Sequence, residues 1–218
     1  MTNNHNDFDS FYASSEWYYQ TEPSEELKEY IDSSTYIKDT ESASSLVALD
    51  LGCGEGRDSV FLSRCGYRVI AVDKSPVGIQ KLGTYAQAHG LSITGVVADV
   101  TSFHISQDSY DLINAVTILD HLDVEANIRL AHAIVQGLKP SGVLFAEVFT
   151  TDDPGYISST ESSETANFVK HYFRKGELKE LFSTLEIVRY EEKLELDTSH
   201  GLPHHHGVAI ILAKKALR

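Results

Sequence analysis

The sequence has few cysteines, few basic residues and no long apolar run. Its 218 residues contain two cysteines, and 18 Lys and Arg stand against 32 Asp and Glu. The formal net charge of −14 argues against a nucleic acid or an anionic membrane as partner, because both would repel the chain. No run approaches the ~20 apolar residues of a transmembrane helix, and the first twenty residues do not resemble a signal peptide. We therefore expect a cytoplasmic protein with no nucleic-acid or membrane partner.

The two cysteines, Cys53 and Cys65, lie close together in the sequence. Cys53 stands between two glycines of a candidate site, which argues against a structural disulfide and for a reducing compartment. The chain length is most simply that of one domain with a large core.

Residues 46–73 carry the strongest pattern and predict a strand–helix–strand unit. An apolar strand over 46–51 is followed by a GxGxG turn, a helix over 57–65, and a strand over 68–72 that ends on Asp73. This order of elements, closed by an acidic residue, is typical of adenosine-binding βαβ units.

The chemistry of this unit favours one cofactor over another. Glycines let a ligand approach backbone N–H groups, and the helix that follows attracts anionic ligand parts. Asp73 can accept both hydroxyls of a ribose. A nicotinamide dinucleotide site would place a third glycine where Arg57 stands. Asp50 can instead receive the ammonium of an amino-acid moiety and Arg57 its carboxylate, which favours S-adenosylmethionine; a nicotinamide-dependent reductase is the alternative.

The stretch DLGCGEGRDSVFLSRCGYRVIAVDKS resembles the class I S-adenosylmethionine-dependent methyltransferases, most closely their tellurite-resistance (TehB-like) and thiopurine-type branch. The resemblance implies an α/β Rossmann-like fold with a seven-stranded, mostly parallel sheet, its last strand antiparallel, and helices on both faces. It implies methyl transfer to a small-molecule acceptor such as tellurite, selenite or a thiol, by a monomer or homodimer. A catalytically silent module that only binds the cofactor is a further alternative.

On this resemblance, the cofactor residues lie at successive strand ends. The methionine part would meet Asp50 and Arg57, and the ribose would meet Asp73. An acid after the third strand, Asp99, would accept the adenine amino group, while the backbone of Val100 serves a ring nitrogen. The full predicted set is Asp50, Gly52, Cys53, Gly54, Arg57, Asp73, Lys74, Asp99, Val100 and Thr117.

The remaining elements follow from apolar spacing and from proline and glycine signals. We expect an N-terminal aromatic lid and helix segment over 1–34 and one methyltransferase domain over 35–218. The expected helices cover 23–31, 76–89, the segment from Val124 to the KPSG turn, and 173–182. The expected strands after the βαβ unit cover 93–98, 110–116, 142–149, 185–196 and 207–214.

Three residues are candidates for binding the acceptor. Relatives of this branch fold a Tyr-Gly-x-x-Pro segment over the cofactor, and Tyr19 matches its tyrosine, although Gln20 replaces its glycine. Tyr12 belongs to the same aromatic cluster, which could equally cap the core. Glu147 is a charge inside an apolar strand, so we expect it to have an ionic partner or to line a wet cleft.

The segment SHGLPHHHG separates the last two expected strands and holds His200 and His204–His206. These side chains could be solvated, contact the acceptor or transfer a proton, or bind a metal. Metal-ligand spacing is usually cleaner than in this segment, so we predict no metal ligand. Alternation would point His204 and His206 to one side and His205 to the other. His121, His204 and His206 are therefore the candidate catalytic bases.

Overall fold

A computed structural model describes residues 7–14, 17–20, 22–33, 46–157, 168–198 and 202–217. The chain divides into two compact units, Met1–Phe103 and His104–Arg218. His200 and the expected boundary between 1–34 and 35–218 lie outside the described residues, so both expectations stay predictions.

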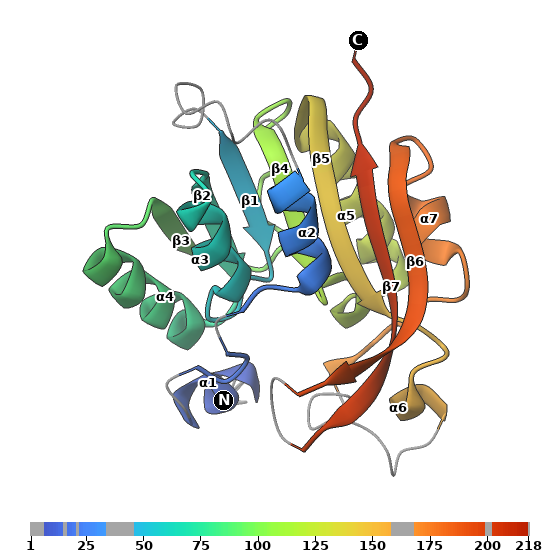
Figure 1. Cartoon of the computed structure of the whole chain (residues 1–218), viewed down its shortest axis with the longest axis horizontal. Coiled ribbons are helices and arrows are strands. Elements are labelled where there is room, and N and C mark those ends of the chain that lie inside the picture. The colour runs from blue at the N-terminus through green and yellow to red at the C-terminus, as the bar shows by residue number, and fades with distance from the viewer. Residues whose placement is uncertain are drawn as a thin grey trace. The chain divides into compact units, whose positions relative to one another are not determined.

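The first unit holds the predicted βαβ pattern. Its strands lie parallel in the order β3-β2-β1 and are β1 (Val47–Leu51), β2 (Arg68–Asp73) and β3 (Ile93–Val97). They are connected by α3 (Arg57–Arg64) and α4 (Pro76–His89), as Figure 1 shows. The start of α4 is fixed by Ser75, whose side chain accepts a hydrogen bond from the Gly78 N–H, and by the proline in its first turn.

Two helices precede β1. The expected amphipathic helix is α2 (Glu25–Ser33), which buries Leu27 and Ile31. The aromatic segment, for which no helix was expected, begins as α1 (Asp7–Ser14). The apolar residues of this short helix do not follow a clear helical period. The sequence therefore indicated the aromatic cluster but did not predict a helix there.

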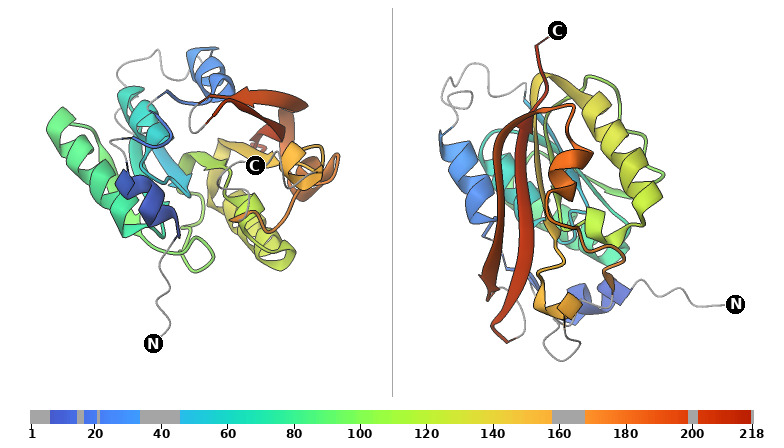
Figure 2. Two further views of the ribbon diagram at one scale, coloured as in Figure 1. Left: turned by 90° about the horizontal axis from the view of Figure 1, so that it is seen from below. Right: turned by 90° about the vertical axis from the view of Figure 1, so that its right-hand side faces the viewer.

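The second unit holds the remaining strands in the order β4-β5-β7-β6. They are β4 (Tyr110–Val116), β5 (Leu138–Phe149), β6 (Glu186–Asp197) and β7 (His204–Lys214). β4 and β5 are parallel, whereas β7 runs antiparallel to both β5 and β6 (Figure 2, right). The seven strands of the chain make one sheet that is mostly parallel with its final strand antiparallel, which confirms the predicted fold class.

The helical segments of the second unit are η3 (Leu119–His121), α5 (Val124–Gly137), α6 (Pro154–Ile157) and α7 (Glu177–Leu181). The helix predicted from Val124 is confirmed as α5, in which Val124 and Ile128 are exposed and Leu130 and Ile134 are buried. Within the described ranges, none of the helices combines the length and apolar character needed to cross a membrane.

Two strands begin earlier than expected. β5 starts at Leu138, because the KPSG turn is a bulge within the strand: the register moves from Tyr110↔Leu138 to Leu112↔Val143. β7 starts at His204 rather than at Gly207, because these residues pair with the end of β6. The three consecutive histidines therefore lie in a strand and have fixed directions.

Candidate functional site

The glycine turn of the first unit is held by the carboxylate of Asp73. Its Oδ2 accepts a hydrogen bond from the Gly54 N–H at 2.9 Å, and its Oδ1 accepts one from the Ser75 N–H at 2.7 Å. Burial raises the pKa of Asp73, while these two N–H donors and the charge of Lys74 oppose the rise. The predicted ribose acceptor is thus also the group that shapes the turn.

Position 54 of the turn and position 78 of α4 leave no room for a Cβ. Gly54 has a positive φ of 54°, and a Cβ there would lie 2.7 Å from the Tyr12 hydroxyl oxygen. A Cβ on Gly78 of α4 would lie 2.5 Å from the Gly54 carbonyl oxygen. The turn is therefore enclosed by α1 on one side and α4 on the other.

Asp50 and Arg57, the residues predicted for the methionine part, have partners within the chain. Asp50 is buried, and its Oδ2 accepts a hydrogen bond from the Ser59 hydroxyl at 2.5 Å. Arg57 forms two contacts with the Asp58 carboxylate, at 3.0 and 3.2 Å. Cys53 is a free thiol, as predicted, and its pKa is raised by burial and by the charges of Asp50 and Asp73.

Glu55 ties the aromatic segment to the glycine turn and was missed in the sequence. This buried carboxylate accepts a hydrogen bond from the Tyr18 N–H at 2.7 Å and forms an ion pair with Lys81 of α4. The Lys81 ammonium also donates to the Tyr12 carbonyl oxygen at 2.6 Å. Tyr12 is itself buried, and its ring lies edge-on to Tyr19 at 6.3 Å between centroids. In the sequence, the one signal for this role of Glu55 was its charge between two glycines.

The residues predicted for adenine lie just beyond β3. Asp99 is exposed, and its Oδ1 accepts hydrogen bonds from the Thr101 N–H and hydroxyl at 2.8 and 2.6 Å. Val100 is buried, whereas Lys74 is exposed with its ammonium 5.8 Å from the Phe8 ring centre. Every predicted cofactor residue except Thr117 thus belongs to the first unit.

Thr117 and Glu147 lie on neighbouring strands of the second unit. Thr117 follows β4 with a positive φ of 47°, and its N–H donates to the Glu147 carbonyl oxygen at 2.8 Å. A β-branched residue in this conformation stores strain of about 1–3 kcal/mol, which is common at functional sites. The half-buried Glu147 lies in register with Val116 of β4 and Ile210 of β7.

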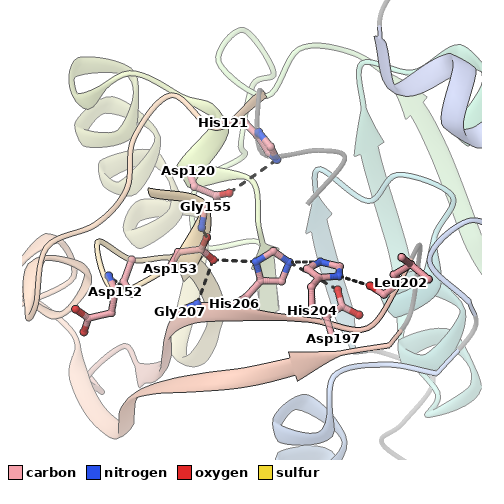
Figure 3. Close-up of polar contacts among 11 residues, drawn as sticks. Asp120, His121, Asp152, Asp153, Gly155, Asp197, Leu202, His204, His206 and Gly207 are labelled. Atoms are coloured by element: carbon pink, nitrogen blue, oxygen red, sulfur yellow. Dashed lines mark hydrogen bonds and ion pairs between the residues drawn. The ribbon is translucent and has the colours of Figure 1, made fainter. Parts of the chain in front are cut away.

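Two of the predicted catalytic histidines lie side by side at the start of β7 (Figure 3). The Nε2 atoms of His204 and His206 are 3.0 Å apart. His205 between them is exposed, as the alternation of side chains along a strand predicts. His206 Nδ1 lies 2.8 Å from Oδ2 of the buried Asp153, just before α6. Asp197 pairs with His204 across the β6–β7 ladder, and its Oδ2 is 3.9 Å from His206 Nε2.

The third predicted base, His121, adjoins a buried carboxylate. Its Nε2 lies 3.8 Å from Oδ2 of Asp120 (Figure 3), and its Nδ1 lies 3.0 Å from the Phe168 carbonyl oxygen. Asp120 is fully buried, and within the described part of the chain neither carboxylate oxygen has a hydrogen-bond partner. Burial raises the pKa of Asp120, and the charges of His121 and His206 oppose this rise.

The same carboxylates act on a nearby phenol. Burial raises the pKa of Tyr172 to about 12, and the negative charges of Asp153 and Asp120 add to the effect.

The second unit therefore brings histidines and carboxylates together, one pair of them from distant parts of the sequence. Asp153 is 53 positions from His206 in the sequence. Asp197 comes close to His204 through strand pairing alone. The chemical types of these acids were visible in the sequence, but their contacts depend on register.

Comparisons with known proteins bear on both units. A family model described as "Tellurite resistance protein TehB" matches residues 12–200. The chain is 29% identical over 150 residues to the probable S-adenosyl-L-methionine-dependent methyltransferase TehB of Haemophilus influenzae, covering 67% of this chain and 48% of that protein. It is 28% identical over 175 residues to hemagglutinin 1 of Eikenella corrodens, covering 77% of this chain and 54% of that protein. The chain spans about half the length of these curated relatives.

A solved structure shows the same fold. The crystal structure of TehB from Haemophilus influenzae has a TM-score of 0.66 and 24% sequence identity to the chain, covering 82% of this chain and 61% of that one. At this identity the likeness concerns the fold, and it agrees with the sheet described above.

Replacing Glu55 by glutamine removes the charge that pairs with Lys81 and keeps the side-chain shape. We expect the free energy of unfolding to fall by about 1–3 kcal/mol, because the ammonium loses a buried partner. Emission of Trp17, the only tryptophan, should shift to the red as its segment loosens. Urea unfolding followed by fluorescence measures both effects. Glu125→Gln, from an exposed pair with Arg129, is the control; equal behaviour of the two variants would contradict the anchoring role.

Replacing Asp120 by asparagine should stabilise the protein at neutral pH. Because the carboxyl pKa is raised in the folded state, the wild-type free energy of unfolding falls as pH rises from the unfolded pKa, near about 4, through the folded one. The variant lacks this titration. The difference in the free energy of unfolding between variant and wild type should therefore grow between pH 4 and pH 7, by about 1.4 kcal/mol per unit of pKa shift. Chemical denaturation at both pH values tests this, with the exposed Asp152→Asn as control. An advantage independent of pH would contradict the assignment.

Proposed function

Because the chain belongs to the tellurite resistance protein TehB family, a branch of the class I S-adenosylmethionine-dependent methyltransferases, we propose that it transfers a methyl group from S-adenosylmethionine to a small molecule. The observation that carries the proposal is the preformed glycine turn, with its backbone fixed by Asp73 and with Asp50 at the end of the preceding strand. Family membership also favours this cofactor over a nicotinamide dinucleotide.

In this proposal each part of the cofactor meets one strand end of the first unit. Asp50 receives the ammonium of the methionine part, and Arg57 its carboxylate. The backbone of residues 52–54 cradles the ligand, and Asp73 accepts the ribose hydroxyls. Asp99 and Val100 serve the adenine. Asp73 is fit for both of its tasks, because each carboxylate oxygen can accept more than one hydrogen bond.

The proposed acceptor is a small molecule, with tellurite, selenite or a thiol as first candidates. The bound cofactor supplies an electrophilic methyl group, so the protein mainly aligns the acceptor and excludes water. A soft anion needs no general base, whereas a hydroxyl or amine benefits from one, and His121, His204 and His206 are the proposed bases. We propose Tyr12, Tyr19, Glu147 and Thr117 as residues that bind or enclose the reactants.

The cofactor assignment is tested by calorimetric titration with S-adenosylmethionine, its demethylated product and NADH. The wild-type protein should bind the first two and not NADH. Asp50→Asn should weaken this binding about 10- to 100-fold, because a charge-assisted hydrogen bond is lost. Ser59→Ala, which removes the hydroxyl partner of Asp50 and keeps its charge, is the control.

Two outcomes would contradict the proposal in different ways. Binding of NADH alone would overturn the cofactor and every cofactor residue. Binding of S-adenosylmethionine without transfer to selenite, tellurite, thiols, phenols or amines would support the silent cofactor-binding module instead.

The double variant His204→Ala, His206→Ala separates the two acceptor classes. It should retain cofactor binding and transfer to selenite, while transfer to a hydroxyl or amine slows about 10²- to 10⁴-fold because the general base is missing. Rates over the acceptor panel give the measurement, and His205→Ala, from the opposite side of β7, is the control. An equal loss on every acceptor would contradict the role as base.

A further inference from the structure

We propose that the end of β6 and the start of β7 form a binding site for a first-row divalent metal ion, with zinc as the expected occupant. The ligands are Nε2 of His204, Nε2 of His206 and a carboxylate oxygen of Asp197 (Figure 3). The site lies wholly in the second unit and does not depend on the proposed methyl transfer. It replaces the expectation from the sequence that these histidines bind no metal.

The ligand atoms have a spacing close to that of a zinc site. All three lie within 4.8 Å of one another, with 3.0 Å between the two Nε2 atoms and 3.9 Å from His206 Nε2 to Asp197 Oδ2. Zinc bonds of 2.0–2.2 Å at tetrahedral angles place ligand atoms about 3.3–3.5 Å apart. The distance between the two Nε2 atoms is slightly shorter than this, and the distance from His206 Nε2 to Asp197 Oδ2 is slightly longer. Small side-chain rotations would bring all three atoms to the spacing of a zinc site.

The hydrogen bonds of the two Nδ1 atoms decide which nitrogen of each ring carries the proton, and they leave both Nε2 lone pairs available to a cation. His206 Nδ1 lies 2.8 Å from Asp153 Oδ2, and His204 Nδ1 lies 2.7 Å from the Leu202 carbonyl oxygen. A carboxylate and a carbonyl only accept hydrogen bonds, so each Nδ1 carries the proton. In the neutral rings both Nε2 lone pairs then face each other across 3.0 Å. That arrangement is repulsive unless a proton or a metal ion lies between them.

Asp153 gives the site the outer support that metal-binding histidines usually have. Its Oδ1 accepts a hydrogen bond from the Gly155 N–H at 2.7 Å, and its Oδ2 accepts one from the Gly207 N–H at 3.1 Å. The carboxylate is therefore held in place before it orients His206. A carboxylate that fixes the ring of a ligating histidine in this way raises the basicity of the nitrogen that binds the metal.

Charge and access also fit a divalent cation. Two carboxylates, Asp153 and Asp197, flank the imidazole pair, so the local charge favours a cation. His204 and Asp197 are half-buried, so the ion can enter from solvent. Three protein ligands leave a fourth position for water or for an oxygen or sulfur atom of an anionic ligand. A bound metal ion would occupy both Nε2 lone pairs, so the base role proposed for His204 and His206, and its test by the double variant, apply to the metal-free protein. In the zinc-bound protein His121 is the remaining proposed base.

The test is zinc titration of the full chain after removal of metals with a chelator. Calorimetry should show one strong site per chain, and cobalt should give the visible absorption of a tetrahedral centre. His204→Ala and Asp197→Asn should each weaken zinc binding at least tenfold, and Asp153→Asn by about 10- to 100-fold through the lost orientation of His206. His205→Ala, which removes an exposed imidazole from the other side of β7, should bind zinc as the wild-type protein does.

Two results would overturn the metal site. One is a wild-type protein that binds no zinc, which would mean that a shared proton joins the two rings. The other is zinc binding that His204→Ala and His205→Ala reduce equally. S-adenosylmethionine is titrated into the same samples, so a protein that binds this cofactor but no zinc contradicts the metal site and leaves the proposed function standing. Because His206 is buried, the primary variants are His204→Ala and Asp197→Asn, whose side chains are half-buried.

Discussion

The first unit depends on the hydrogen bonds that the Asp73 carboxylate accepts at the end of β2. One oxygen fixes the glycine turn after β1, and the other fixes the chain entering α4. A single side chain therefore holds the start of both connections between the strands of this unit. Glu55, inside that turn, then holds the aromatic segment through Lys81. Buried carboxylates are costly, and these two are offset by N–H donors and an ammonium. The cofactor region is thus built on charges whose positions are set before any ligand arrives.

The second unit is organised differently, by the register of a long antiparallel pair. β6 and β7 remain paired beyond the last residue of β5, out to Asp197 opposite His204. In a ladder of this kind side chains alternate strictly, so a shift of one residue would exchange His205 for its two neighbours. The chemistry of the histidine cluster therefore depends on the same backbone pairing that completes the sheet.

Most of the fold could be predicted from the sequence, because apolar runs, prolines and glycines act locally. The βαβ unit and α4 followed from such signals, and the family resemblance supplied the seven-stranded, mostly parallel sheet with its last strand antiparallel. The start of β7 could not be predicted, since three histidines carry no apolar pattern and are held in a strand only by the partner that β6 provides. Apolar spacing located α5 but does not decide which residues are buried, because tertiary packing leaves the apolar Val124 and Ile128 exposed. For the site, the acids at strand ends were predictable by position. Glu55 and Asp153 were not, because their roles arise from contacts distant in sequence, and Asp197 was not, because its role depends on the register of β6 and β7.

Gly207 links the histidine cluster to the loop that precedes α6. A Cβ at this position would lie 2.4 Å from the backbone nitrogen of Asp153, so β7 and the loop touch main chain to main chain. A larger residue at 207 would displace the backbone that carries the Asp153 carboxylate, and with it the group that orients His206. Because the clash is with main-chain atoms, no substitution at 153 relieves it. Position 207 should therefore accept only glycine, even in a variant of the chain that has lost the carboxylate at 153.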